Sequence, residues 1–253
     1  MKKKKSSFIF KIIKGLIHLF YGKMEIVGKD NIPENNAILV GNHTQMNGPI
    51  VGEIFMDDNC YIWCAGEMMN TKEIPNYAFS DFWSQKPRWT HCFYKILSYI
   101  ITPIAACIFN NARTIAVYHD MRVMSTFKES IKMLGKGANI LIFPEKDEKH
   151  NNIVYQFQEN FVDIAKLYYK KTGISLQFIP VYVAPKLRKT FIGEGIIFNC
   201  ENKIEDERIR ISNYLSDEIT RIARELPKQN VVPYRNIAKK YYLTNKDVTE
   251  VPR

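Results

Sequence analysis

The stretch AILVGNHTQMNGP, residues 37–49, sets the fold class expected for this chain. Its apolar run 38–40 is short and bounded by turn residues, which predicts a buried strand. Pro49 suits the first turn of a helix, which we expect over 50–55. His43 then lies on the loop leaving a strand, where a rigid scaffold holds a side chain within reach of a substrate.

An imidazole on such a loop can remove a proton from a substrate near neutral pH. A purely structural role for His43, capping the turn, fits its position equally well. The surrounding pattern therefore has to distinguish a functional histidine from a structural one.

Strand-like and helix-like segments alternate along the chain. Strands are expected at 24–27, 38–40, 60–64, 114–118, 139–143, 177–183 and 195–198, and helices at 50–55, 121–134, 160–171 and 204–226. This alternation predicts a single-domain layered α/β fold with a mostly parallel central sheet flanked by helices. Functional loops of such folds lie at the carboxyl ends of the strands, where both His43 and Glu145 fall.

Two further motifs follow the histidine loop. Residues 139–145 read NILIFPE, a strand running into Pro-Glu, and residues 177–183 read QFIPVYV, a strand with an internal proline. The NH loop, the FPE strand end and the IPV strand, in that order, resemble the glycerolipid acyltransferases of the lysophosphatidate acyltransferase kind, over roughly 26–225. The resemblance implies transfer of a fatty acyl group from acyl-CoA or acyl-carrier protein to a lysolipid hydroxyl, with His43 as general base and no bound cofactor.

The first motif departs from the family pattern. The resemblance implies an Asp five residues after the histidine, to orient the imidazole; here that position is Gly48, preceded by Asn47. The amide oxygen of Asn47 would fix the tautomer without a charge, and Glu145, Asp147 or Glu53 would supply a charge, since the sequence alone does not say which of these three lies near the histidine. We therefore expect His43, Asn47 and Glu145 to be the catalytic residues.

The anion-binding motifs also differ. The resemblance implies an Arg at the end of the second motif, where this chain has His119, and a Gly after the FPE motif, where it has Lys146. We expect the substrates to be held by Asn42, Arg113, His119, Lys146 and Lys149. Oxygen-bearing side chains gather over 145–152, but their spacing fits no metal-binding loop, so no metal is expected.

The net charge of +10 over 253 residues indicates an anionic partner. No nucleic-acid-binding motif is present, so an anionic membrane surface is the expected partner and nucleic acid is not. Five cysteines form an odd, scattered set, which is typical of a reducing compartment. We expect a cytoplasmic protein, peripheral on the inner face of the cell membrane.

Three regions are expected along the chain. Residues 1–23 combine lysines with a broad apolar face, which is typical of a helix lying on a membrane surface. Residues 24–227 form the acyltransferase-like domain, and 228–253 form a polar, basic tail, extended or poorly ordered. The apolar stretch 92–109 is close to spanning length but contains Pro103, so we expect a helix buried in the fold or dipping into the membrane surface.

Two other functions remain open. Loss of both the Asp and the Arg is what drift would produce in a non-catalytic member that binds a lipid or an acyl carrier at the membrane. A site that admits water would hydrolyse thioesters instead of transferring the acyl group.

Overall fold

The computed structural model describes residues 7–34, 36–118 and 120–247. The chain forms two compact units, the first made of Met1–Gly22 and Ile62–Glu129 and the second of Lys23–Tyr61 and Ser130–Arg253. His43 and Glu145 both belong to the second unit. The division into regions 1–23, 24–227 and 228–253 stays a prediction.

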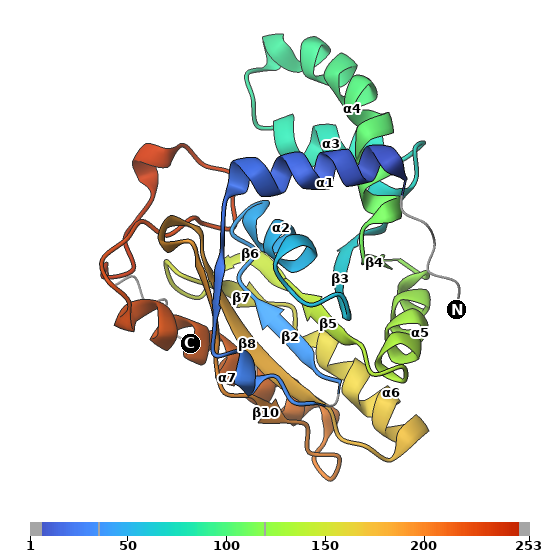
Figure 1. The fold of residues 1–253 in the computed structure, drawn as a ribbon, viewed down its shortest axis with the longest axis vertical. Helices are drawn as coiled ribbons and strands as arrows, with labels where there is room; N and C mark the ends of the chain where they lie inside the picture. Colours follow the sequence, from blue (N-terminus) through green and yellow to red (C-terminus); the bar gives the residue numbers. More distant parts are fainter. Residues whose placement is uncertain (1–6, 35, 119, 248–253) are drawn as a thin grey trace. The chain divides into compact units, whose positions relative to one another are not determined.

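The second unit is built on a mostly parallel sheet (Figure 1). Its strands, in spatial order, are β1 (Glu25–Val27), β9 (Lys189–Ile192), β8 (Gln177–Ala184), β2 (Ile38–Gly41) and β5 (Asn139–Ile142), with β10 (Ile196–Ile197) beside β8. The pairs β1–β9, β8–β2 and β2–β5 are parallel, whereas β8–β9 and β8–β10 are antiparallel. The predicted α/β fold class is confirmed.

Helices cover this sheet because its central strands are apolar on both sides. Every residue of β2 is buried, and so are all residues of β8 after Gln177. The amphipathic helix α7 (Ile204–Glu225) packs on β8, and α2 (Asn47–Ile54) contacts the same strand (Figure 1). Helix α6 (Asp163–Thr172) ends at Gly173, whose φ of 73° suits glycine.

The first unit pairs β3 (Cys60–Ala65) with β4 (Thr114–Val117) in parallel. Its helices are α1 (Phe8–Tyr21), α3 (Ile74–Ala78) and α4 (His91–Asn111), and α5 (Val123–Leu134) continues into the second unit. A small core joins α3 to α4 through Ile74 and Ala105, and α1 contacts α4. Short helices lie at Lys29–Asn31, Gly66–Met69, Phe79–Trp83, Arg88–Thr90, Glu159–Val162, Pro185–Leu187 and Lys239–Tyr241.

Two features of the second unit were not expected from the sequence. The charged run after Pro144 is a strand, β6 (Glu145–Lys149), paired antiparallel with β7 (Tyr155–Phe157), and the buried Glu145 carboxylate accepts a hydrogen bond from the Tyr155 backbone N–H. The tail, as far as the structure describes it, is not loose: residues 228–247 fold back on the second unit, held by buried side-chain hydrogen bonds described below.

Candidate active site

His43 and Glu145 follow two adjacent parallel strands, β2 and β5, which end at the same level. In the sheet, Val40 of β2 lies opposite Ile142 of β5 and Pro180 of β8. The polar residues that follow β2 and β5 therefore meet at the carboxyl edge of the sheet. The structure thus brings the backbone of His43 and the Glu145 carboxylate together, while the predicted roles of both residues stay predictions.

Glu145 fixes the backbone around the histidine. Its carboxylate is 3% exposed and accepts hydrogen bonds from the backbone N–H groups of His43 and Tyr155, the latter at 2.8 Å. Burial raises the pKa of Glu145 from 4.5 to about 7, although both backbone hydrogen bonds act to lower it. No described hydrogen bond joins this carboxylate to the imidazole, so Glu145 is a positioning residue for the loop in this structure.

Asn42 clamps the same loop to β8. Its side chain is 1% exposed, its Oδ1 accepts from Val183 N–H at 2.7 Å, and its Nδ2 donates to the Val183 carbonyl at 3.2 Å. The side-chain amide thus pairs with both backbone groups of Val183, as a residue of a neighbouring strand would. The amide predicted to bind substrate is thus engaged in holding His43 in place.

The turn after His43 has an unusual backbone. Thr44 and Gln45 have φ angles of 45° and 57°, in the left-handed region that side chains disfavour. Asn47 stabilises this turn, because its Nδ2 donates to the Thr44 carbonyl at 2.7 Å and its N–H donates to the same oxygen at 3.1 Å. Backbone strain of this kind persists where the surroundings impose it, and it concentrates at functional sites.

Two buried polar atoms in this loop make no hydrogen bond to the described residues: His43 Nδ1 and Thr44 Oγ1. Asn47 therefore does not fix the imidazole through Nδ1 in this structure, and its catalytic role stays a prediction. Since nearly all buried polar atoms in proteins have a partner, such an adjacent pair calls for an explanation. A bound substrate group would supply one.

The imidazole itself lies among aromatic rings. The Phe143 ring centroid is 5.5 Å from that of His43, edge to face, and the Tyr234 centroid is 5.7 Å away in the same manner. Burial lowers the pKa of His43 from 6.5 to about 4, and the backbone of Gln45 offsets this in part. The imidazole is neutral at pH 7, which is the form that accepts a proton.

The predicted anion-binding residues are not all brought to this edge. Two tyrosine rings lie between Lys149 and the imidazole. The Lys149 Nζ is 6.0 Å from the Tyr155 ring centroid, and the Tyr155 centroid is 5.6 Å from that of Tyr234, which contacts His43. Lys146 is partly buried on β6, Arg113 belongs to the first unit, and His119 lies outside the described residues. Their ligand-binding roles stay predictions.

Three aromatic residues at the site had no assigned role in the sequence reasoning: Phe143, Tyr155 and Tyr234. Phe143 was counted only as the end of a strand, and its contact with His43 follows from the level ends of β2 and β5. Nothing in the sequence around Tyr234 indicates that it reaches a loop nearly two hundred positions earlier. Within the described part of the chain, no group of three or more His, Cys, Asp or Glu residues is arranged to hold a metal ion.

No protein-family model matches the chain, and no curated protein matches it significantly. The chain is similar to a solved structure, that of the 1-acyl-sn-glycerophosphate (LPA) acyltransferase PlsC from Thermotoga maritima, at 18% sequence identity and a TM-score of 0.43. The likeness covers 86% of this chain and 78% of that one. A likeness of this size does not establish a family, so the function is argued from the site itself.

Proposed function

We propose that this protein is an acyltransferase that moves a fatty acyl group from a thioester donor, acyl-CoA or acyl-carrier protein, to a hydroxyl of a lysophospholipid or related membrane acceptor. The observation that carries the proposal is the neutral His43 imidazole with an unpartnered Nδ1, held on a strained loop at the carboxyl edge of a parallel sheet. The motif order shared with glycerolipid acyltransferases supplies the reaction class.

In this reaction His43 acts as general base. The imidazole takes the proton of the acceptor hydroxyl while that oxygen attacks the thioester carbonyl carbon. The C–S bond then breaks, and the imidazolium returns the proton to the leaving thiolate. The products are an ester and a free thiol, and no covalent enzyme intermediate forms.

The loop geometry explains how His43 would be aimed without the carboxylate that the resemblance implies. Glu145 and Asn42 fix the backbone on either side of the reacting residue, through His43 N–H and through Val183. The imidazole lacks a charged orienting partner among the described residues, and replacing the equivalent Asp in serine proteases by Asn costs about 10⁴-fold in rate. We therefore expect turnover to be slow.

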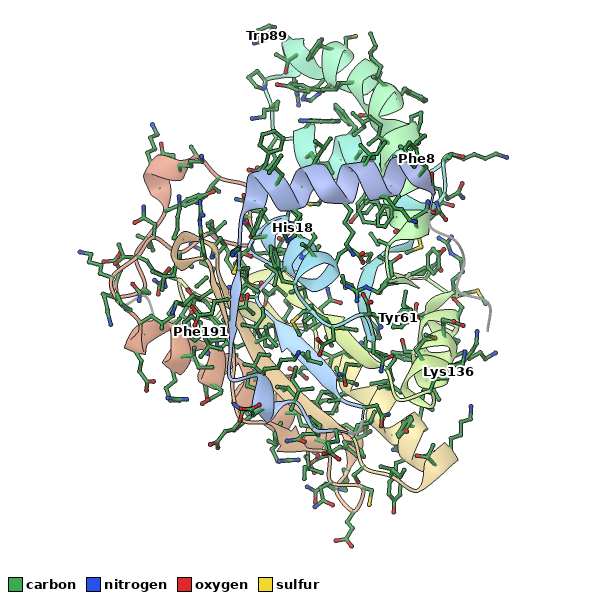
Figure 2. All side chains as sticks on the ribbon, in the orientation of Figure 1. Phe8, His18, Tyr61, Trp89, Lys136 and Phe191 are labelled. Atoms are coloured by element: carbon green, nitrogen blue, oxygen red, sulfur yellow. The ribbon has the colours of Figure 1, made fainter. Side chains whose placement is uncertain are left out.

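We also propose that the protein works at an anionic membrane surface on the cytoplasmic side. Large apolar side chains are exposed on two contacting helices of the first unit, α1 and α4, among them Phe20 at 84% and Phe93 at 64%. Figure 2 shows Phe8 at the start of α1 and Trp89 beside the start of α4. Lys11 and Lys14 lie on α1, so apolar and cationic groups share one surface element, as interfacial helices do.

This exposed apolar set is defined here as the α1–α4 face. Its members are Phe8, Ile9, Ile12, Leu16, Leu19, Phe20, Trp89, Phe93, Ile96, Tyr99, Ile100 and Ile104. By length and composition alone, Arg88–Asn111 is the one helix among the described residues that reaches membrane-spanning length. Soluble monomers rarely expose so many large apolar side chains on two neighbouring helices without a partner.

Purified full-length protein incubated with labelled acyl-CoA and a panel of lysolipids tests the proposal. We expect acylated lipid to form, and we expect His43→Ala to abolish it without loss of fold, while His150→Ala, a second-unit histidine beside Asp217, retains it. Near wild-type turnover in folded His43→Ala would overturn the role of His43. Binding of donor or lysolipid without turnover would favour the non-catalytic alternative, and release of free fatty acid would favour a hydrolase.

A further inference from the structure

The chain after α7 forms a closed strap, residues 228–247, whose two ends are tied together. Asn245 is 0% exposed; its Nδ2 donates to the Ala223 carbonyl at 2.7 Å, and its Oδ1 accepts from Gln229 N–H at 2.9 Å. A backbone hydrogen bond from Val231 to the Leu243 carbonyl, 2.9 Å long, closes the strap further along. The base of the strap is therefore firmly anchored in the second unit.

The tip of the strap, residues 233–242, covers the histidine loop. The Tyr234 ring makes a T-shaped contact with the His43 imidazole. Gln45 donates from Nε2 to Tyr242 Oη at 3.0 Å and to the Arg235 carbonyl at 3.3 Å. The tip therefore contacts both His43 and Gln45, and it closes one side of the site.

The outer side of the tip has a distinct composition. The tip, residues 233–242, contains three basic residues, Arg235, Lys239 and Lys240, and no Asp or Glu. Lys239 and Lys240 are exposed, and beside them stand exposed Ile237 (38%) and Tyr241 (62%). Cationic and apolar side chains together on an exposed segment are typical of a peptide that binds an anionic lipid surface.

The closed tip is at odds with general-base catalysis. An acceptor hydroxyl has to come within about 3 Å of the imidazole, on the side of the ring not already packed against protein. Phe143 and Tyr234 both contact the ring, and the desolvation they contribute lowers the pKa of His43 well below its usual range, which weakens it as a base. Removing the tip would expose the ring and hydrate it.

We propose that the tip of the strap is a lid over His43 that opens when its exposed lysines and apolar side chains bind an anionic lipid surface. The proposal rests on the proposed function, since a lid over His43 matters only if His43 meets a lipid substrate. The anchored base serves as the hinge. Opening breaks the contacts of the tip with Gln45 and Asp147 and the ring contacts of Tyr234 with His43 and Tyr155.

The chemistry of the tip favours a lipid surface over an acidic protein. Apolar Ile237 and Tyr241 stand next to the lysines, and each lysine near an anionic membrane contributes about 1 kcal/mol of binding. The tip is joined to β6 by the exposed Arg235–Asp147 ion pair, with 3.5 Å between Nε and Oδ1. Lipid phosphate would compete with Asp147 for the Arg235 guanidinium.

The test measures access to His43 and needs no transfer activity. Full-length protein at pH 7 is treated with diethyl pyrocarbonate, which modifies neutral imidazoles, and the modification rate of His43 is followed by peptide mass spectrometry with His150 as internal reference. We expect slow modification of His43 in the wild type and an increase of about tenfold with phosphatidylglycerol vesicles, but none with phosphatidylcholine vesicles. Tyr234→Ala should modify fast without vesicles, and Tyr234→Phe, which keeps the ring, should behave as wild type.

Variants of Lys239 and Lys240 test separately whether the tip protects His43 and whether its lysines bind the lipid surface. Lys239→Gln with Lys240→Gln should lose the effect of vesicles while His43 stays protected, and the Lys→Arg pair should keep the effect. Unchanged modification of the wild type on phosphatidylglycerol would overturn the proposal, and so would acceleration by an acidic acyl-carrier protein alone. If vesicles speed the modification of His43 but no lysolipid is acylated, the proposed acyltransferase function is wrong, and the proposal that the tip is a lid still holds.

Discussion

The ring of Phe143 fills the space into which a side chain at Gly48 would project. A Cβ atom on Gly48 would lie 2.7 Å from Phe143 Cε1 and 2.8 Å from the His43 carbonyl oxygen, closer than real Cβ contacts allow. The resemblance to acyltransferases implies a carboxylate at this position. In this chain the Phe143 ring, at the end of the neighbouring strand β5, occupies that space. Glycine at position 48 therefore fits the packing of this site, and an Asp would not.

We therefore expect Gly48→Asp alone to destabilise the protein by about 1–3 kcal/mol, as overpacked cores do, and not to raise acyl transfer. Gly48→Ala should destabilise as well, because its Cβ alone meets the Phe143 ring. Urea unfolding measures both. Gly15→Ala on α1, where a Cβ would meet nothing within 4 Å, is the matched glycine control and should leave stability unchanged or higher.

Removing the Phe143 ring should relieve the closest of the clashes at position 48, while the close approach to the His43 carbonyl oxygen stays. In the Phe143→Ala background, Gly48→Asp should cost less stability than in the wild type, a non-additivity expected of residues in contact. The double variant should also gain transfer activity over Phe143→Ala alone, since the introduced carboxylate would then orient the imidazole. Equal costs of Gly48→Asp in the two backgrounds would show that Phe143 does not fill this space.

The two titrating groups of the site have opposite effects on stability. Between about pH 4.5 and 6.5 the unfolded chain carries a proton on His43 that the folded chain lacks, and the folded chain carries one on Glu145 that the unfolded chain lacks. The first difference makes stability rise with pH, and the second makes it fall. The wild type should therefore show little net slope from this pair.

Single variants should expose each slope. In Glu145→Gln only the titration of His43 remains, so the free energy of unfolding should rise as the pH goes from about 4 to 6.5. In His43→Gln only the titration of Glu145 remains, so the free energy of unfolding should fall as the pH goes from about 4.5 to 7. Each slope has an upper bound of about 1.4 kcal/mol per pH unit. Urea unfolding at several pH values measures them, with the double variant as the flat control. Slopes of the same sign would contradict the assignment.

Hydrophobic runs were sufficient to predict that His43 and Glu145 lie at the carboxyl ends of strands, because such runs locate parallel strands whose polar ends share one edge. The contacts within the site were not predictable in the same way. Glu145 lies in a charged run, and its burial follows from two backbone N–H groups, which no side-chain pattern encodes.

The strap was missed for a related reason. It has no helical or strand periodicity, and its base is held by Asn245, whose side chain bonds to carbonyls at the end of α7. Composition alone indicated a polar, basic tail. This describes the exposed residues of the strap but not its buried residues, such as Asn245. Order in this segment comes from long-range hydrogen bonds, so sequence reasoning based on local pattern underestimates it.

The clamp formed by Asn42 makes a further prediction. Asn42→Ala removes both hydrogen bonds to Val183 and leaves its N–H and carbonyl buried without partners, so stability should fall by about 1–3 kcal/mol. If Asn42 only positions the loop, kcat should fall more than KM rises, and if it binds substrate, KM should rise most. Asn59→Ala, which loses one exposed hydrogen bond to Gly137, is the control and should change little.

We expect the α1–α4 face to be the surface that binds the proposed membrane. Replacing two exposed apolar residues by serine, either Leu19 with Phe20 on α1 or Phe93 with Ile96 on α4, should weaken binding to phosphatidylglycerol vesicles by at least about tenfold, since burying one such side chain contributes about 1.5–3 kcal/mol.

Co-sedimentation with vesicles measures this binding, and Ile174→Ser with Ile209→Ser supplies the control, because both residues are comparably exposed, at 54% and 53%, in the second unit. Higher salt should weaken binding of the wild type only in part, because it screens the lysines and leaves apolar burial intact. Binding that salt abolishes completely, and that the serine pairs leave unchanged, would mean that charge alone holds the protein at the surface. The α1–α4 face would then need another partner to account for its exposure.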